Sequence, residues 1–331
     1  DNIIMSNLKL KITLILSFFV LHSCQKKAET EDLNDFIYLE STIESLINGY
    51  KNGDIKAVDV IKKYIDRIKK IDMAGPNLRS IIQINPDAVK IATELDNLIA
   101  RGELKGALHG IPVILKDNID TGDKMNTTAG SRALINSKAN KDAFIVKKLR
   151  ESGAIILGKA NLSEWANFRG QNSTSGWSGV NGQTKNPYVL SRNPCGSSSG
   201  SGVAVSANLT VLAIGTETNG SIVCPSNANG IVGIKPTVGL ISRTGIIPIS
   251  FTQDTSGPMA RTLTDAVIAL NAMKGEDPLD SKTLSIPNKN LDYTKFLRHG
   301  GIKNKRIGVY SLPIGNKSRR KGYNADVDTL F

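Results

Sequence analysis

The sequence has few of the residues that build metal centres and histidine-based active sites. Its 331 residues include three cysteines and three histidines. Three cysteines cannot form a disulfide framework, and the spacing of Cys24, Cys195 and Cys224 fits no zinc pattern. Among the histidines, only His109 lies near residues that could do chemistry. A catalytic base other than histidine is therefore favoured, and the cysteines do not indicate a zinc site.

The N-terminal part lacks an apolar run long enough to span a bilayer. Residues 12–21 form an apolar run of ten residues that follows Lys9 and Lys11. This is the pattern of an export signal and is too short for a permanent membrane helix. Residues 21–24, Leu-His-Ser-Cys, resemble the lipobox of bacterial lipoproteins, in which the cysteine is lipidated. An ordinary cleaved signal with a chance cysteine is the alternative.

The lipobox interpretation predicts three segments. Residues 1–24 would be a signal peptide with Cys24 as the lipidation site, residues 25–40 a polar tether, and residues 41–331 the folded domain. The chain would then be held at a membrane by its N-terminal lipid. The predicted location is the bacterial cell envelope, either periplasmic or at the outer surface.

The formal net charge of +12 does not by itself indicate a nucleic-acid partner. An RNA-binding signature with interleaved aromatics is missing, and the basic residues are scattered or crowded toward the C-terminal end. Scattered charge of this kind is typical of a solvated surface. We therefore expect no nucleic-acid partner.

Apolar strands and helical segments alternate along the chain, which predicts an α/β layered domain. A capping box at residues 41–44 should begin a helix that runs to about Asn52. The predicted strands are 79–84, 112–115, 154–157, 211–214 and 231–234. The further predicted helices are 55–71, 85–101, 142–151, 203–208 and 262–273.

Two Gly/Ser turns and one lysine are the strongest chemical signals. Residues 195–202 read Cys-Gly-Ser-Ser-Ser-Gly-Ser-Gly, and residues 215–222 read Gly-Thr-Glu-Thr-Asn-Gly-Ser-Ile. Lys116 ends the apolar run 112–115. A serine hydroxyl needs a base, and a buried lysine can be that base when its amine is neutral. The alternatives are an anion-binding nest for the turns and a solvent-seeking side chain for the lysine.

Residues 153–159 match the first seven positions of a phosphate-loop motif. Ala160 stands where a hydroxyl residue would hold magnesium, and the intervening residues are aliphatic. This segment therefore indicates a strand and not a nucleotide-binding loop.

Taken together, these motifs resemble those of the amidase signature hydrolases. Residues 195–201 correspond to the family's Gly-Gly-Ser-Ser-Gly-Gly-Ser motif, and residues 215–223 to Gly-Thr-Asp-Thr-Gly-Gly-Ser-Ile-Arg. The residues that depart from these motifs are Cys195, Ser199, Glu217, Asn219 and Val223. These departures are similar to a branch that contains bacterial peptide amidases. The resemblance implies a central mixed β-sheet flanked by helices on both faces, in a domain over 41–331 that is truncated at its C-terminal end.

The resemblance also implies a role for each matching residue. Ser221 would be the nucleophile, Lys116 the neutral base, and Ser197 the bridging serine, preceded by a cis peptide bond. Ser198 would support this network. The oxyanion-hole N–H donors would be Thr218, Asn219, Gly220 and Ser221.

The implied reaction is hydrolysis of a carbon–nitrogen bond, with ammonia released through an acyl-enzyme. The resemblance implies no metal or organic cofactor for it. The expected partner is a small-molecule or peptide amide, such as a C-terminal carboxamide. The same residues also fit the A subunit of a glutamyl-tRNA amidotransferase. A third possibility is an inactive fragment or a non-catalytic binder.

Overall fold

The computed structural model describes residues 36–287 and 290–307. The chain divides into two compact units, one ending at Leu291 and the other beginning at Asp292. The domain predicted over 41–331 stays a prediction, and each unit is described by itself. The sheet and every candidate site residue that is described lie in the first unit. In the second unit, the described residues include a short 3-10 helix, Tyr293–Phe296.

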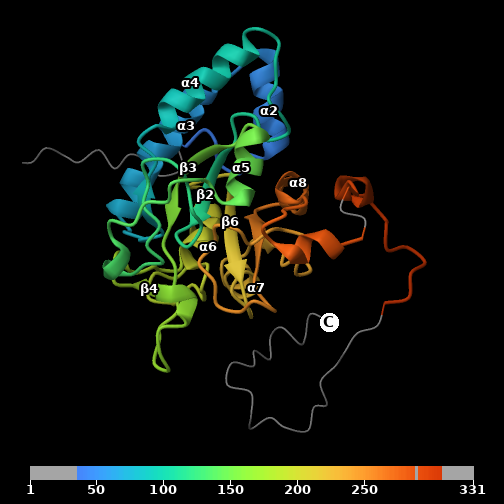
Figure 1. Cartoon of the computed structure of the whole chain (residues 1–331). Helices are drawn as coiled ribbons and strands as arrows, with labels where there is room; N and C mark the ends of the chain where they lie inside the picture. Colours follow the sequence, from blue (N-terminus) through green and yellow to red (C-terminus); the bar gives the residue numbers. More distant parts are fainter. Residues whose placement is uncertain (1–35, 288–289, 308–331) are drawn as a thin grey trace, which may run out of the picture. The chain divides into compact units, whose positions relative to one another are not determined.

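A six-stranded mixed sheet forms the centre of the first unit (Figure 1). Its strand order is β1-β3-β2-β6-β8-β7. Strand β2 runs parallel to β3 on one side and to β6 on the other, while the pairs β1–β3, β6–β8 and β7–β8 are antiparallel. The strands are β1 (Ile81–Ile84), β2 (Pro112–Lys116), β3 (Ile155–Ala160), β6 (Leu212–Glu217), β7 (Val232–Gly233) and β8 (Thr255–Ala260). A separate small hairpin pairs β4 (Trp177–Ser178) with β5 (Gly182–Gln183).

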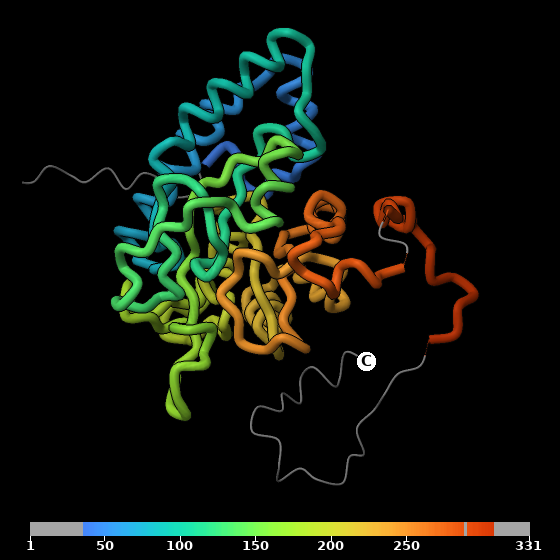
Figure 2. The backbone as a smooth tube through the Cα atoms, viewed as in Figure 1, coloured from blue at the N-terminus to red at the C-terminus, as the bar shows by residue number. Residues whose placement is uncertain are grey.

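Helices flank this sheet, as the ribbon and the backbone trace show (Figures 1 and 2). Helix α6 (Ser199–Ser206) is built from small residues and packs across β2, β3, β6 and β8. Seven of its eight residues are buried, because glycine and serine let its backbone approach the strands closely. The other helices are α2 (Ile43–Asn52), α3 (Ala57–Arg67), α4 (Ala88–Ile99), α5 (Phe144–Glu151), α7 (Val223–Ala228) and α8 (Leu263–Met273). A π-helical turn, Ile68–Met73, continues α3.

The sequence predicted most of these elements, with shifts at their ends. The aliphatic part of segment 153–159 lies in β3, as expected, and not in a loop. The first helix starts one residue late, because the capping box pairs Thr42 with Ser45. Strand β8 was not predicted: its sequence, Thr-Ser-Gly-Pro-Met-Ala, contains glycine and proline and shows no clear period. Its six residues are buried and pair with all of β6, so tertiary contact forms this strand.

The predicted tether extends too far along the chain. Residues 36–40 belong to the folded unit, where Phe36 stacks edge-on against Tyr64 and lies under the guanidinium of Arg67. The Glu40 carboxylate accepts a hydrogen bond from the Asn208 side chain. In the described ranges, none of the helices has the length and apolar character that a bilayer crossing requires.

Candidate active site

Lys116 lies at the end of the central strand β2 with its side chain fully buried. All five residues of this strand are buried, because β3 and β6 cover both of its edges and helices cover the sheet. The amine Nζ donates to Ser197 Oγ at 2.7 Å. It also donates to Thr216 at the end of β6, to Oγ1 at 2.9 Å and to the carbonyl oxygen at 3.1 Å. The lysine therefore does not reach solvent, which removes the alternative of a solvent-seeking side chain.

Burial lowers the pKa of Lys116 to about 7, while the negative charges of Glu217 and Asp254 oppose that change. A charged ammonium loses its hydration in such a place, so the neutral amine becomes accessible near neutral pH. The partners of Nζ are two hydroxyl oxygens and a carbonyl oxygen, and none is a carboxylate. This set can stabilise either protonation state, which suits a group that accepts and returns a proton.

The first Gly/Ser segment forms the loop before α6. The peptide bond between Gly196 and Ser197 is cis, as the resemblance implied. Ser197 is 1% exposed, and Ser198 lies directly before the helix. The Ser198 hydroxyl donates to the Thr216 carbonyl at 3.1 Å and accepts from the Thr216 N–H at 3.2 Å. Ser198 thus fastens the loop to β6, whose Thr216 also accepts hydrogen bonds from the lysine amine.

The second Gly/Ser segment forms the turn between β6 and α7. Ser221 is half-buried there, and its carbonyl oxygen accepts the N–H of Ser198 at 3.1 Å. The two serine segments are therefore neighbours, although they are separated by more than twenty residues in the sequence. The hydrogen bonds among the described residues do not include one between the hydroxyls of Ser197 and Ser221.

A buried carboxylate shapes this turn. Glu217 Oε1 accepts the N–H of Gly220 at 2.7 Å, and Oε2 accepts those of Ile222 at 2.7 Å and Val223 at 3.0 Å. The Gly220 N–H, which the resemblance placed in the oxyanion hole, therefore already has a partner. Within the described part of the chain, no hydrogen bond engages the N–H groups of Thr218, Asn219 or Ser221. These three groups remain the candidate oxyanion donors.

The structure corrects the expectation about cysteine. Cys195 and Cys224 form a disulfide, with their Cα atoms 5.9 Å apart. It joins the residue that is two positions before Ser197 to the first turn of α7, three positions after Ser221. Three cysteines are too few for a disulfide framework, but a single bridge needs only two cysteines that the fold brings together.

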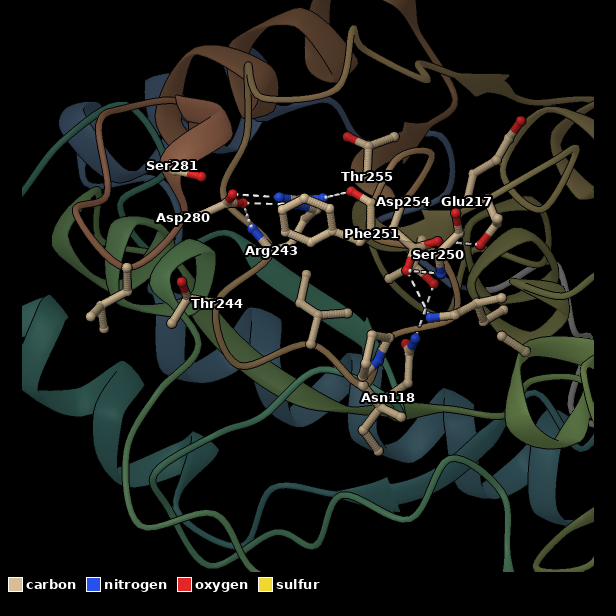
Figure 3. A pocket seen from close by; sticks show the side chains of 18 residues that line it. Asn118, Glu217, Arg243, Thr244, Ser250, Phe251, Asp254, Thr255, Asp280 and Ser281 are labelled. Atoms are coloured by element: carbon tan, nitrogen blue, oxygen red, sulfur yellow. Dashed lines mark hydrogen bonds and ion pairs between the residues drawn. The ribbon is translucent and has the colours of Figure 1, made fainter. Parts of the chain in front are cut away.

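A cavity of about 540 Å³ opens beside these segments (Figure 3). Asn118 and Thr216 connect it to the lysine, because the Asn118 amide donates to Thr216 Oγ1 at 3.1 Å and Lys116 shares that oxygen. Apolar side chains of residues 246–249, Phe251 and Leu279 form part of the wall. An ion pair between Arg243 and Asp280 also lines the cavity, on the side away from Asn118 in Figure 3. The wall therefore combines an apolar surface with polar and charged side chains next to the strand ends.

Several residues of the site were missed from the sequence. Thr216 and Glu217 lie inside the second Gly/Ser segment, and Asn118 lies two residues after Lys116. Their partners become known only when the strands are placed side by side. His109 is buried away from the serines, where it bonds to the Lys105 N–H and the Leu95 carbonyl oxygen. In the described ranges, no three His, Cys, Asp or Glu side chains gather in a way that could hold a metal ion.

Comparison with known proteins agrees with this geometry. The amidase family model matches residues 59–324, which is most of the sequence. The chain belongs to the amidase family. The predicted family and its mixed α/β fold are therefore confirmed, as is the expectation of an enzyme family that hydrolyses amides.

Relatives are similar over most of this chain. The solved peptide amidase of Stenotrophomonas maltophilia is 53% identical, with a TM-score of 0.77 over 78% of this chain and 53% of that one. A probable amidase of Arabidopsis thaliana is 46% identical over 90% of this chain and 58% of its own length. The A subunit of the glutamyl-tRNA(Gln) amidotransferase of Thermoanaerobacter pseudethanolicus is 42% identical over 81% of this chain and 52% of its own. The chain spans about half the length of the curated relatives it matches.

These relatives contradict the predicted location in a bacterial cell envelope. Plant and fungal amidases match this chain over 78–90% of its length, and such proteins are not bacterial envelope lipoproteins. The prediction was wrong because a short apolar run followed by a cysteine is a weak pattern. Cys24, the predicted lipidation site, lies outside the described residues, as does the predicted signal peptide 1–24.

Proposed function

We propose that the chain hydrolyses carboxamides, with Ser221 as nucleophile, Ser197 as proton relay and Lys116 as base. The observation that carries this proposal is the fully buried amine of Lys116, 2.7 Å from the hydroxyl of Ser197. A buried charge is usually paired with an opposite one, and the three hydrogen-bond partners of this amine do not include a carboxylate. A neutral amine with a pKa of about 7 has the proton affinity that general base catalysis near neutral pH requires.

In the proposed reaction, Ser221 Oγ attacks the amide carbonyl carbon. Its proton passes to Ser197 Oγ while the proton of Ser197 passes to the neutral amine of Lys116. The carbonyl oxygen becomes an oxyanion, for which the N–H groups of Thr218, Asn219 and Ser221 are available. When the intermediate collapses, the carbon–nitrogen bond breaks, and the ammonium of Lys116 returns its proton through Ser197 to the leaving nitrogen. Ammonia departs.

The acyl-enzyme then reacts with water by the same route in reverse. Water loses a proton through Ser197 to Lys116, its oxygen attacks the ester carbon, and Ser221 takes the proton back as the acid is released. Two steps with moderate barriers replace one difficult displacement. The substrate class we propose is a peptide with a C-terminal carboxamide, because residues 246–249 and Phe251 give the cavity an apolar surface for a peptide side chain and the Arg243 guanidinium is already paired with Asp280.

The alternative, the A subunit of an amidotransferase, fits the same three residues. Greater similarity to the peptide amidase, 53% identity against 42% for the amidotransferase chain, favours the amidase. Hydrolysis of a peptide carboxamide without partner subunits would separate the two.

The test measures ammonia release from a peptide carboxamide, together with covalent labelling by a serine-directed fluorophosphonate. We expect the unaltered chain to release ammonia and to be labelled on Ser221, and Ser221→Ala to do neither. Ser206→Ala is the matched control, because its hydroxyl bonds to Tyr188 on the exposed side of α6. Equal ammonia release or equal labelling in Ser221→Ala would remove the assignment.

A further inference from the structure

The carboxylate of Asp254 connects two segments that line the cavity. Its Oδ1 accepts the hydroxyl of Thr218 at 2.5 Å. Its Oδ2 accepts the backbone N–H groups of Ile249 at 2.7 Å and Ser250 at 2.8 Å. One side chain therefore holds both the turn that leads to Ser221 and the loop that forms the cavity wall.

Sheet register explains why these groups meet. In the β6–β8 pair, Glu217 lies opposite Thr255 as the last paired residues. Thr218 and Asp254 are the next residues outward, so both lie just beyond the end of the ladder. The loop before Asp254 folds back on it, since the Asp254 N–H also donates to the Ser250 carbonyl at 3.0 Å. Figure 3 shows Asp254, Ser250 and Glu217 gathered on one side of the pocket.

Two carboxylates divide the turn between them. Glu217 holds the part that begins at Gly220 and continues into α7. Asp254 holds the part that begins at Thr218, whose N–H is one of the candidate oxyanion donors. The orientation of that N–H depends on the peptide plane at Thr218, and a fixed side chain restricts the rotation of that plane.

We propose that Asp254 is a positioning residue for amide hydrolysis: it couples the cavity wall at 249–250 to the oxyanion turn through the Thr218 hydroxyl. This inference rests on the proposed function. When a carboxamide fills the cavity and contacts the loop at 249–250, a displacement of that loop moves the Asp254 carboxylate and, through the Thr218 hydroxyl, the turn. Binding energy from the acyl part of the substrate then orients the donors at the reacting carbonyl.

The experiment is a double-mutant cycle on the full chain. Thr218→Val removes the hydroxyl at nearly constant shape, and Asp254→Asn leaves one acceptor oxygen for three donors. For a peptide carboxamide, we expect each single change to lower kcat by roughly 10- to 100-fold with KM within about twofold, because oriented donors act in the transition state. The double variant should be no slower than the slower single variant, because both changes break one interaction. Thr218→Ser keeps the hydroxyl and should restore kcat to within about threefold of the original.

The matched control is Ser80→Ala, at the residue directly before β1. There the buried Asp72 accepts the Ser80 hydroxyl at 2.5 Å, and backbone N–H groups of Ser80 and Ile81, in the same pattern. This change should lower the melting temperature without changing kcat. An additive cycle, a rise in KM at constant kcat, or failed rescue by Thr218→Ser would overturn the proposal. Failure of the proposed function looks different, because Ser221→Ala, measured alongside, would then equal the unaltered chain.

Discussion

Two lysines on neighbouring strands are equally buried but have different surroundings. Lys116 on β2 and Lys159 on β3 both have 0% exposure. In the register of these strands, Lys159 lies opposite Leu115, one residue from Lys116. Successive side chains of a strand point to opposite faces, so the two amines leave the sheet in opposite directions. Burial lowers the pKa of both side chains.

The difference lies in what each amine contacts. Lys116 reaches Ser197 of the serine loop and Thr216 at the end of β6. Lys159 donates to the Ile119 carbonyl at 2.6 Å and to Thr127 at 3.1 Å, close to the buried carboxyl of Asp117. Burial raises the pKa of Asp117 to about 6, against the charge of Lys159. Burial of a lysine is thus not by itself evidence of catalysis. The proposed base differs from Lys159 because its amine contacts the hydroxyl of Ser197.

The largest effect should follow from Lys116→Met. This change removes the proposed base and should lower kcat for a peptide carboxamide by roughly 10³-fold, within the range for general bases. The melting temperature should fall little or rise, because a buried amine gives way to an apolar side chain. Ammonia release and thermal unfolding measure the two quantities. Retained activity would show that Lys116, like Lys159, is not needed as a base.

Lys159→Met should give the opposite pattern. It leaves the Asp117 carboxyl and the Ile119 carbonyl without their buried partner, so we expect the free energy of unfolding to fall by about 3 kcal/mol. The molecules that remain folded should keep kcat within about threefold. Denaturant unfolding measures the loss.

Adding Asp117→Asn to Lys159→Met should recover part of that stability, because the uncompensated charge is then also removed. No recovery would show that the carboxyl of Asp117 is not the group that Lys159 compensates.

The smallest effect is a pH difference. Because Lys116 must be neutral to accept a proton and its pKa is about 7, kcat/KM should rise with pH and level off above about pH 7. Asp254→Asn should move the midpoint to lower pH, since the Asp254 charge raises that pKa. Lys159→Met should leave the midpoint unchanged. A shifted midpoint in Lys159→Met would show that the two lysines titrate as a coupled pair.

The lowered pKa values of these lysines also make the free energy of unfolding depend on pH. The pKa of Lys116 is about 7 in the folded chain and higher in the unfolded one, so between about pH 7 and 10.5 the unfolded chain holds the proton that the folded chain has lost. Burial lowers the pKa of Lys159 as well, which gives its contribution the same sign. The contribution of Lys116 to the free energy of unfolding should therefore rise from about pH 7 toward the ordinary lysine pKa of 10.5.

Local sequence pattern was sufficient to predict the elements that carry Lys116, Ser197 and Ser221. The apolar run before Lys116 predicted β2, and the glycines around Ser197 and Ser221 predicted two tight turns. Strand β8 was not predictable, because its glycine and proline hide the period that marks a strand. Asp254 was missed for the same reason: its partners, Thr218 and Ile249, become neighbours only when β8 pairs with β6.

The sequence alone determined which side chains could do chemistry and the short backbone segments that carry them, because turn residues and apolar periodicity act over a few positions. Only the tertiary structure decided which of two lysines meets a serine hydroxyl, which cysteines pair and which carboxylates hold the turn. Those outcomes depend on strand register and burial, and contacts between residues tens or hundreds of positions apart set both.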